Sequence, residues 1–254
     1  MYKPYYLKDV IESEKRELFT VMSTFAGGGG SSTGYRLAGG KILAINEFVE
    51  EARKTYSENY PNTPIMPDDI KEITGKDILD VINLKEGELD ILDGSPPCSA
   101  FSVAGAMVQG GHSKGFNQTK KYSDGKKIEN IEDLFFEYLR VAKEIKPKVI
   151  VAENVKGITV GEAKQKLNEF INAFQNIGYD VTYKVMNAAH YGVPQARERT
   201  MFVCVREDVC ESVGLNFMTL GNIFPRENDE LVTLRHALED IENDKDEEQM
   251  LLDY

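Results

Sequence analysis

The stretch "FTVMSTFAGGGGSSTGY", residues 19–35, decides the fold class of this sequence. Its first seven residues, Phe19–Phe25, form a short apolar run with the length of a buried strand, and a glycine-rich turn follows directly. Glycines let the backbone turn sharply and approach a ligand that a side chain would block. A strand that ends in such a loop is typical of nucleotide-binding α/β folds, in which ligands sit at the carboxyl ends of the strands.

Short apolar runs and longer amphipathic segments alternate along the rest of the chain. Further strands are expected at 40–47, 89–94, 148–154, 179–188 and 200–206, and helices at about 48–59, 128–146 and 161–177. This alternation predicts an α/β fold with a doubly wound, Rossmann-like and mostly parallel sheet.

Composition narrows the class of protein. No run of about 18 apolar residues occurs and the N-terminus lacks the apolar core of a signal peptide, so we expect a soluble protein in the cytoplasm. The cysteines are Cys98, Cys204 and Cys210, an odd number without zinc-ligand spacing, which favours neither disulfides nor a metal site. The net charge is −12, but residues 224–254 carry 11 acidic and 3 basic side chains, which leaves −4 for residues 1–223. We interpret this acidic segment as a solvated terminus.

The glycine-rich loop is weak evidence on its own, and an acidic residue about 20 positions later strengthens it. Glu47 ends the second expected strand, where such folds hold ribose hydroxyls. Asp69, in "PDDI", is a candidate for contact with an adenine amino group. The loop has neither the lysine of a P-loop nor a strict G-x-G-x-x-G, which favours an adenosine ligand other than a nucleoside triphosphate.

A second motif, "DGSPPCSAFS" at Asp93–Ser102, places Cys98 after two prolines. Their fixed φ angles can hold the sulfur at the carboxyl end of a strand. A thiol with an ordinary pKa is only a few per cent thiolate at neutral pH, so a nucleophilic Cys98 needs help. A cysteine can also be a small buried hydrophobe, which suits Cys204 inside "MFVCVR" better.

Polar residues follow two other strands. Glu153, in "VIVAENVKG", is either a surface carboxylate or an acid held beside a heterocyclic ring nitrogen. Arg197 and Arg199, in "QARERTMFV", lie two residues apart at a strand entrance, so their side chains should point the same way, toward an anionic or polar ligand.

Together, these motifs resemble those of the cytosine-5 DNA methyltransferases, in that family's order, over about residues 19–240. The matching segments are "FAGGGGSSTGY", "NE" at Asn46–Glu47, "DI" at Asp69–Ile70, "PPCSAFS", "DLFFEYLR" at Asp133–Arg140, "ENV" at Glu153–Val155 and "QARER" at Gln195–Arg199. Ser99 and Ser95 depart from the commonest residues of the family at those positions, and neither change removes a catalytic group.

The resemblance implies methyl transfer from S-adenosylmethionine to carbon 5 of a cytosine flipped out of DNA, with S-adenosylhomocysteine as product. Cys98 would attack carbon 6, and Glu153 would hold the ring nitrogen 3 edge. Arg199, with Arg197 near it, would orient the base or steady the thiolate. The resemblance also implies a set of cofactor-binding residues: Phe25, Ala26, Gly27, Gly29, Gly30, Glu47, Phe48, Asp69, Ile70, Pro97 and Leu134. The glycine- and lysine-rich interval from Val103 to Lys127 matches the family's mobile loop, which closes over DNA; otherwise it is a surface insertion.

The family continues into a target-recognition domain and two further motifs that this sequence lacks. We therefore expect an N-terminal extension (1–18), a catalytic domain (19–223) and an acidic segment leading toward an absent recognition domain (224–254). The chain would be one subunit of a split enzyme, with a second subunit for recognition, or a truncated product, and it would be of prokaryotic or phage origin. Three alternatives remain: a non-catalytic subunit that binds S-adenosylmethionine, a transfer RNA cytosine-5 methyltransferase, and a dehydrogenase that binds NAD.

Overall fold

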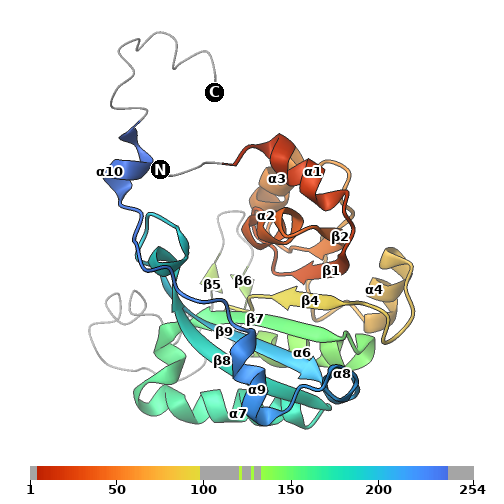
Figure 1. Ribbon diagram of the computed structural model, residues 1–254. Helices are drawn as coiled ribbons and strands as arrows, with labels where there is room; N and C mark the ends of the chain where they lie inside the picture. The colour runs from red at the N-terminus through yellow and green to blue at the C-terminus, as the bar shows by residue number, and fades with distance from the viewer. Residues whose placement is uncertain (1–4, 98–119, 122–126, 129–132, 240–254) are drawn as a thin grey trace.

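The computed structural model describes residues 5–97, 120–121, 127–128 and 133–239. Within these residues a seven-stranded sheet has the order β3-β2-β1-β4-β7-β9-β8 (Figure 1). Strands β3, β2, β1, β4 and β7 are parallel, whereas β9 runs antiparallel to both β7 and β8. The fold is therefore the Rossmann-like α/β fold predicted from the sequence, with a mostly parallel sheet. The strands are β1 (Phe19–Thr24), β2 (Gly40–Asn46), β3 (Ile65–Met66), β4 (Ile91–Gly94), β7 (Val149–Val155), β8 (Tyr179–Asn187) and β9 (Glu198–Arg206), and the short β5 (Lys120–Lys121) and β6 (Lys127–Ile128) pair separately.

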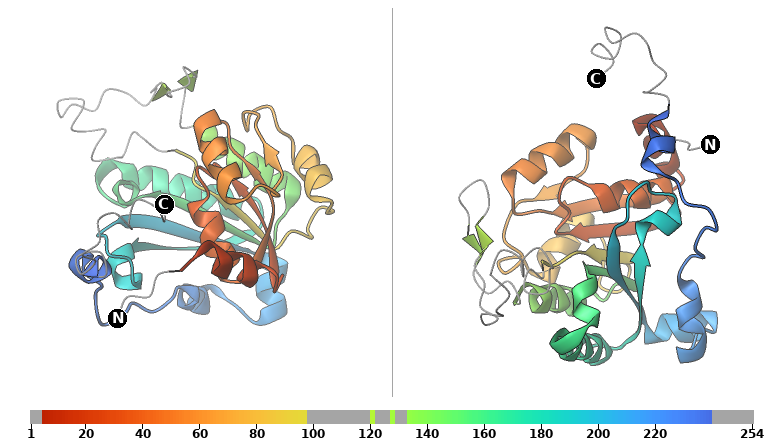
Figure 2. Two further views of the ribbon diagram at one scale, coloured as in Figure 1. Left: turned by 90° about the horizontal axis from the view of Figure 1, so that it is seen from above. Right: turned by 90° about the vertical axis from the view of Figure 1, so that its left-hand side faces the viewer.

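Helices cover both faces of the sheet, as the two views in Figure 2 show. One face packs against α4, α6 and α7, and the other against α1, α2 and α3. The helices are α1 (Leu7–Glu14), α2 (Gly30–Leu37), α3 (Glu50–Asn59), α4 (Gly75–Ile82), α6 (Asp133–Ile145), α7 (Lys164–Gln175), α8 (Glu207–Val213), α9 (Phe217–Leu220) and α10 (Leu234–Ala237), with 3₁₀ turns at Lys156–Thr159, Gly161–Ala163, Ala188–Tyr191 and Gly221–Ile223.

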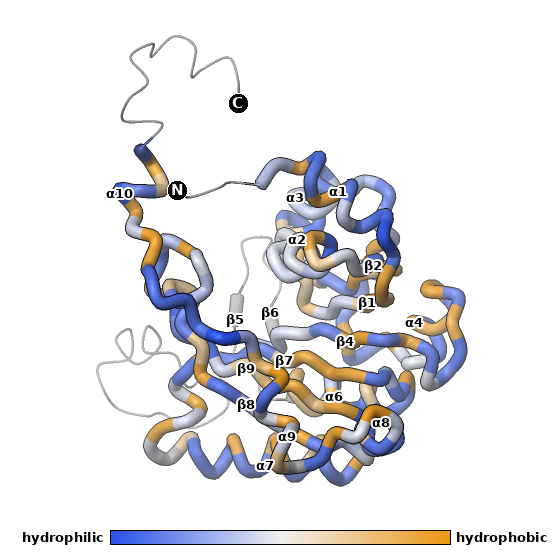
Figure 3. Tube along the Cα trace, in the orientation of Figure 1, coloured by the Kyte–Doolittle hydropathy of each residue, from blue (hydrophilic) through white to orange (hydrophobic). Residues whose placement is uncertain are grey.

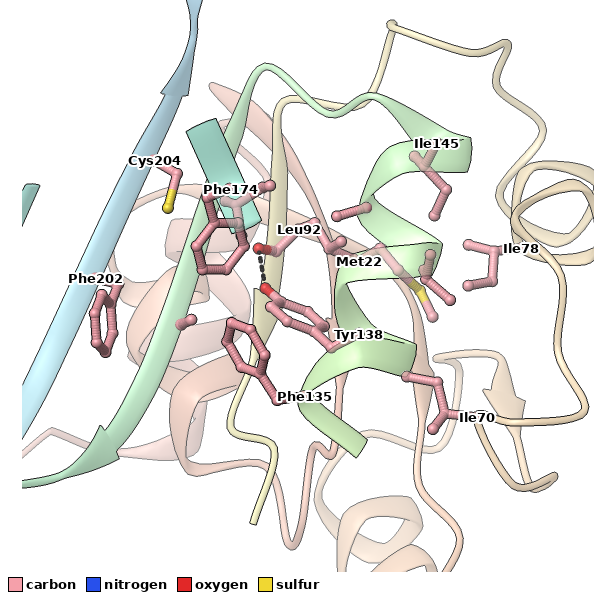
Figure 4. Close-up of a cluster of buried hydrophobic side chains, with 14 of the residues drawn as sticks. Met22, Ile70, Ile78, Leu92, Phe135, Tyr138, Ile145, Phe174, Phe202 and Cys204 are labelled. Carbon is pink, nitrogen blue, oxygen red and sulfur yellow. Dashed lines mark hydrogen bonds between the residues drawn. The ribbon is translucent and has the colours of Figure 1, made fainter. Parts of the chain in front are cut away.

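Helix α6 shows why the sequence folds in this way. Its buried residues recur three or four positions apart and form one apolar stripe that faces the sheet: Leu134, Phe135, Tyr138, Val141, Ala142 and Ile145. Figure 4 shows Phe135, Tyr138 and Ile145 of this stripe on the side of α6 that faces Met22 of β1 and Leu92 of β4. The Tyr138 hydroxyl donates to the Leu92 carbonyl at 3.0 Å, so its polar end is satisfied inside the core.

The hydropathy of the chain follows these layers. In Figure 3, apolar residues run along β7 and α6, whereas the chain that leads to α10 is mostly hydrophilic. Cys204 is fully buried in the main core cluster, as the sequence predicted. Among the described helices, none is long and apolar enough to cross a membrane. Nor do the described His, Cys, Asp and Glu side chains include a group of three or more that could hold a metal ion.

Candidate active site

The carboxyl ends of four strands bring the predicted site residues to one edge of the sheet. Strands β1, β2, β4 and β7 run parallel, so the loops that follow them start at the same edge. The glycine-rich loop follows β1, Glu47 follows β2, Pro97 follows β4, and Glu153 lies near the end of β7. Ligands in open α/β sheets bind at this edge, which makes it the candidate active site.

The backbone of the glycine-rich loop faces open space at Gly27 and Gly30 and packs against tyrosine rings at Gly29. Gly27 and Gly29 have φ angles of +56° and +96°, a region that favours glycine. A Cβ atom added at Gly27 or Gly30 would meet no atom within 4 Å, whereas one at Gly29 would lie 3.0 Å from the Tyr56 ring. Phe25, which precedes the loop, also has a positive φ of 52°. The loop therefore has room for a ligand beside Gly27 and Gly30.

Glu47 is in direct contact with this loop. Its carboxylate accepts a hydrogen bond from the Gly27 amide at 2.8 Å and one from the Val49 amide at 2.7 Å. The side chain is buried, so these bonds replace the water that the carboxylate has lost. The Ala26 amide donates to the Asn46 carbonyl at 3.3 Å, which joins the loop to the end of β2 a second time.

Asn46 holds the segment that carries the predicted adenine contacts. Its buried amide nitrogen donates to the carbonyls of Met66 and Asp68, at 3.0 and 2.9 Å. Asp69 follows and accepts from the Lys71 amide at 3.1 Å. Three apolar residues of the predicted cofactor set belong to the hydrophobic core. Ile70 and Leu134 are buried in the main core cluster, and Phe48 is partly buried against it.

The two groups predicted to hold a substrate base form an ion pair. The Arg199 Nε donates to the Glu153 Oε1 at 2.8 Å, and both side chains remain about 30% exposed, at 28% and 30%. The pair forms because β7 and β9 are antiparallel neighbours in which Val155 lies opposite Arg199, so Glu153 is its diagonal neighbour on the same face. The structure thus places a carboxylate and a guanidinium side by side, within reach of solvent.

Arg197 is not part of that pair. Its side chain is exposed, and its carbonyl accepts a hydrogen bond from the Ala188 amide at 2.9 Å. Glu198, between the two arginines, points to the opposite face and pairs with Lys156 at 2.8 Å. Of the two arginines predicted to act together, Arg199 alone contacts Glu153 within the described residues.

The predicted nucleophile, Cys98, lies outside the described residues, as do Ser99 and the interval from Val103 to Lys127 apart from its short strands. The described chain leads to Pro97 through Gly94, which has no room for a side chain. A Cβ atom there would lie 2.5 Å from the Tyr138 ring and 2.7 Å from the Thr24 hydroxyl. This close packing fixes the end of β4 from which the cysteine motif leaves.

Asp93 of β4 is a buried carboxylate beside the candidate site, and no motif in the sequence predicts its role. Its buried carboxylate accepts hydrogen bonds from the Ser23 hydroxyl at 2.8 Å and the Tyr35 hydroxyl at 3.1 Å. Burial, and to a smaller extent the charge of Glu153, raise the pKa of Asp93, whereas the two hydrogen bonds lower it; the net result is a pKa of about 6. Its signal in the sequence is a carboxylate inside the strand run "LDILDG".

We expect Asp93→Asn to change how stability depends on pH. Because the pKa of Asp93 is raised in the folded protein, the wild type loses stability as the pH rises from about 4 through about 6, by up to about 3 kcal/mol relative to the variant. Urea unfolding of both proteins between pH 4 and pH 8 measures this difference. A difference that stays constant with pH would contradict the prediction.

Asp90 offers a control of opposite sign. Burial pushes the pKa of Asp90 up, but hydrogen bonds from Lys148 and Thr20 outweigh it and leave that pKa below its ordinary value. Asp90 therefore stabilises the fold above its unfolded-state pKa, and this contribution is lost as the pH falls. In the wild type, the contribution of Asp90 to the free energy of unfolding decreases as the pH falls, and Asp90→Asn should remove this decrease.

A family model and several curated relatives match this chain, and they agree on the kind of protein. A family model described as C-5 cytosine-specific DNA methylase matches residues 19–254. The chain is 32% identical over 222 residues to type II methyltransferase M.Eco47II of Escherichia coli, covering 87% of this chain and 46% of the relative. It is 36% identical over 185 residues to M.XorII of Xanthomonas oryzae pv. oryzae, covering 72% and 39%. The chain thus spans about half the length of these relatives, or less. For M.AquIA of Picosynechococcus, 34% identical, the alignment covers 72% of this chain and 70% of the relative.

Solved structures share the fold. A protein described as a DNA modification methyltransferase encoded within an E. coli prophage superposes with a TM-score of 0.65 at 24% identity, covering 87% of this chain and 54% of that one. The DNMT2 protein of Spodoptera frugiperda gives a TM-score of 0.55 at 19% identity, covering 85% of this chain and 54% of that one. At these identities the likeness supports the fold.

Proposed function

Because this chain belongs to the C-5 cytosine-specific DNA methylase family, we propose that it binds S-adenosylmethionine and transfers the methyl group to carbon 5 of cytosine in DNA. The observation that carries the proposal is the gathering of two groups at one sheet edge. These are the glycine-rich loop with Glu47, and the ion pair of Glu153 with Arg199.

The residues of the loop fit the proposed cofactor. The open space at Gly27 and Gly30 leaves room for the methionine portion, and Glu47 is held by the Gly27 amide where ribose hydroxyls can donate to it. Asn46 fixes the segment that leads to Asp69, on the adenine side. When bound, S-adenosylmethionine would supply an electrophilic methyl group on its sulfonium.

The remaining chemistry is assigned to residues of the protein. Cys98 adds as a thiolate to carbon 6 of the flipped cytosine, which makes carbon 5 nucleophilic. Glu153 holds the nitrogen 3 edge and, after taking a proton from water, passes it to nitrogen 3 as the sulfur adds, while Arg199 keeps Glu153 in place and contacts the base. Methyl transfer releases S-adenosylhomocysteine. A base then removes the proton from carbon 5, the bond between carbon 6 and the sulfur breaks so that Cys98 leaves as a thiolate, and nitrogen 3 returns its proton to Glu153.

Recognition of a DNA sequence is proposed to need protein outside these 254 residues. The chain spans 46% of M.Eco47II and 39% of M.XorII, so much of those relatives has no counterpart in the alignment. We propose that a target-recognition part, in a continued chain or a second subunit, binds DNA together with this domain. We also propose, from the bacterial relatives M.Eco47II and M.XorII, that the protein acts in the cytoplasm of a prokaryotic cell.

Methyl transfer tests the proposal directly. The chain, alone and combined with a recognition region from a relative such as M.Eco47II, is incubated with radiolabelled S-adenosylmethionine and either DNA or transfer RNA. We expect label at carbon 5 of cytosine in DNA. Label in transfer RNA alone would overturn the choice of substrate, and binding of the cofactor without transfer to either would favour a non-catalytic subunit.

We expect Glu47→Ala to weaken binding of S-adenosylmethionine about 10- to 100-fold, because a hydrogen bond to a charged group contributes about 1.5–3 kcal/mol. Titration calorimetry measures the dissociation constant. Glu58→Ala, which removes an exposed carboxylate from the following helix, is the matched control and should bind as the wild type does. Equal affinities of the Glu47 and Glu58 variants would contradict the assignment.

A further inference from the structure

Arg36 of α2 is a buried arginine whose hydrogen-bond partners come from three other parts of the chain. Its side chain is 1% exposed. Its Nε donates to Glu14 of α1 at 2.9 Å, its Nη1 to the Tyr56 hydroxyl of α3 at 3.2 Å, and its Nη2 to the Thr63 hydroxyl at 2.7 Å. A guanidinium is rarely buried unless it is paired, and Glu14 supplies the negative charge.

The same guanidinium stacks on the aromatic rings behind the glycine-rich loop. Its central carbon lies 3.8 Å from the centroid of the Tyr60 ring, a cation–π contact, and Tyr60 packs against Tyr56 with centroids 5.3 Å apart. These two rings lie against Gly29, where a Cβ atom would be 3.0 Å from Tyr56 and 3.3 Å from Tyr60. The position of Arg36 therefore determines the surface on which the loop rests.

Glu14 connects this cluster to the sheet as well. One carboxylate oxygen binds Arg36, and the other accepts a hydrogen bond from the Ile42 amide of β2 at 3.3 Å. This amide lies where the register between β1 and β2 shifts. A single carboxylate thus joins the helix that follows the glycine-rich loop to the strand that ends before Glu47.

We propose that Glu14 is a positioning residue for the cofactor site: through Arg36 and the two tyrosine rings, α1 holds the glycine-rich loop in its binding conformation. The inference rests on the proposed function, in which that loop binds S-adenosylmethionine. It assigns a role to a helix that precedes the family match, which begins at residue 19. The cofactor affinity of this chain then depends on a contact outside the matched region.

The experiment compares Glu14→Gln with Glu17→Gln, which breaks an exposed ion pair to Lys41 close to the same helix. Dissociation constants for S-adenosylmethionine are measured by titration calorimetry at one temperature, and unfolding midpoints in the absence of cofactor. We expect Glu14→Gln to bind roughly tenfold more weakly, which corresponds to about 1.4 kcal/mol, and Glu17→Gln to bind unchanged. In the methyl-transfer assay the KM for cofactor should rise while kcat at saturation stays the same.

A second variant covers failure of the first to fold. Thr63→Val removes one acceptor from Arg36 and leaves the ion pair intact, and it should weaken cofactor binding in the same direction by a smaller factor. If Glu14→Gln folds and binds S-adenosylmethionine with unchanged affinity, the inference is overturned, even if its unfolding midpoint is lower. If Glu14→Gln does not fold, unchanged affinity in Thr63→Val overturns the inference in the same way. If the wild type itself does not bind S-adenosylmethionine, the proposed function fails and the inference fails with it.

Discussion

A Cys98→Ser variant is expected to bind S-adenosylmethionine as the wild type does and to lose methyl transfer by roughly three orders of magnitude or more. The reason is the acidity of the attacking group. A few per cent of a cysteine thiol is ionised at neutral pH, whereas a serine hydroxyl is almost entirely protonated and is a weak nucleophile toward carbon 6. Cys98 lies outside the described residues, so this expectation rests on its place in "PPCSAFS".

The covalent adduct provides the measurement. In DNA that contains 5-fluorocytosine, the carbon 5 substituent cannot leave as a proton does, so the enzyme should remain attached to DNA in a denaturing gel. The matched control is Cys210→Ser, which keeps a donor near the Val205 carbonyl that the buried Cys210 thiol contacts at 3.8 Å. An adduct formed by Cys98→Ser, or none formed by Cys210→Ser in a folded protein, would contradict the assignment.

The sequence predicted the long elements because each has one dominant apolar pattern. The strands at 19–25, 148–154 and 200–206 and the helix that ends near 146 are present with shifts of a few residues at their ends. Helix α4 is not among the helices predicted from the sequence, although its N-terminus carries a recognisable signal. Thr74 and Asp77 form a capping box, and Ile78 and Ile82 follow at helical spacing.

Helix α2 was harder to predict because its local sequence does not favour a helix. "GSSTGYRL" contains two glycines, and one of its fully buried side chains is the charged Arg36. Its stability comes from tertiary contacts, such as those of Arg36 with Glu14 and Tyr56. A sequence pattern that treats buried residues as apolar cannot detect such a helix.

In the candidate site, too, the individual residues could be predicted from local motifs, whereas their contacts with one another could not. Glu153 and Arg199 were each expected from a motif, and their ion pair depends on the antiparallel pairing of β7 with β9, which the predicted parallel alternation did not specify. Asp93 received no role because its chemistry depends on burial and on the hydroxyls of Ser23 and Tyr35, which come from β1 and α2. Contacts between elements distant in sequence have no local signal.

The ion pair carries the last prediction. Glu153→Gln should lower kcat about 10²- to 10⁴-fold, because an amide can still accept hydrogen bonds but cannot transfer a proton to the cytosine ring. Arg199→Ala should also lower kcat, since it leaves the carboxylate of Glu153 without the partner that holds it at 2.8 Å. Because one group acts through the other, the double variant should lose less than the product of the two single losses.

The neighbouring pair of Lys156 with Glu198 is the matched control for this cycle. It joins the same end of β9 to the turn that follows β7, also at 2.8 Å, and lies on the opposite face from Glu153. Glu198→Gln should therefore leave kcat and cofactor affinity unchanged. Equal losses of kcat in Glu153→Gln and Glu198→Gln would mean that other groups hold the base. Losses from the Glu153 and Arg199 variants that simply multiply would mean that the two residues do not act as one catalytic unit.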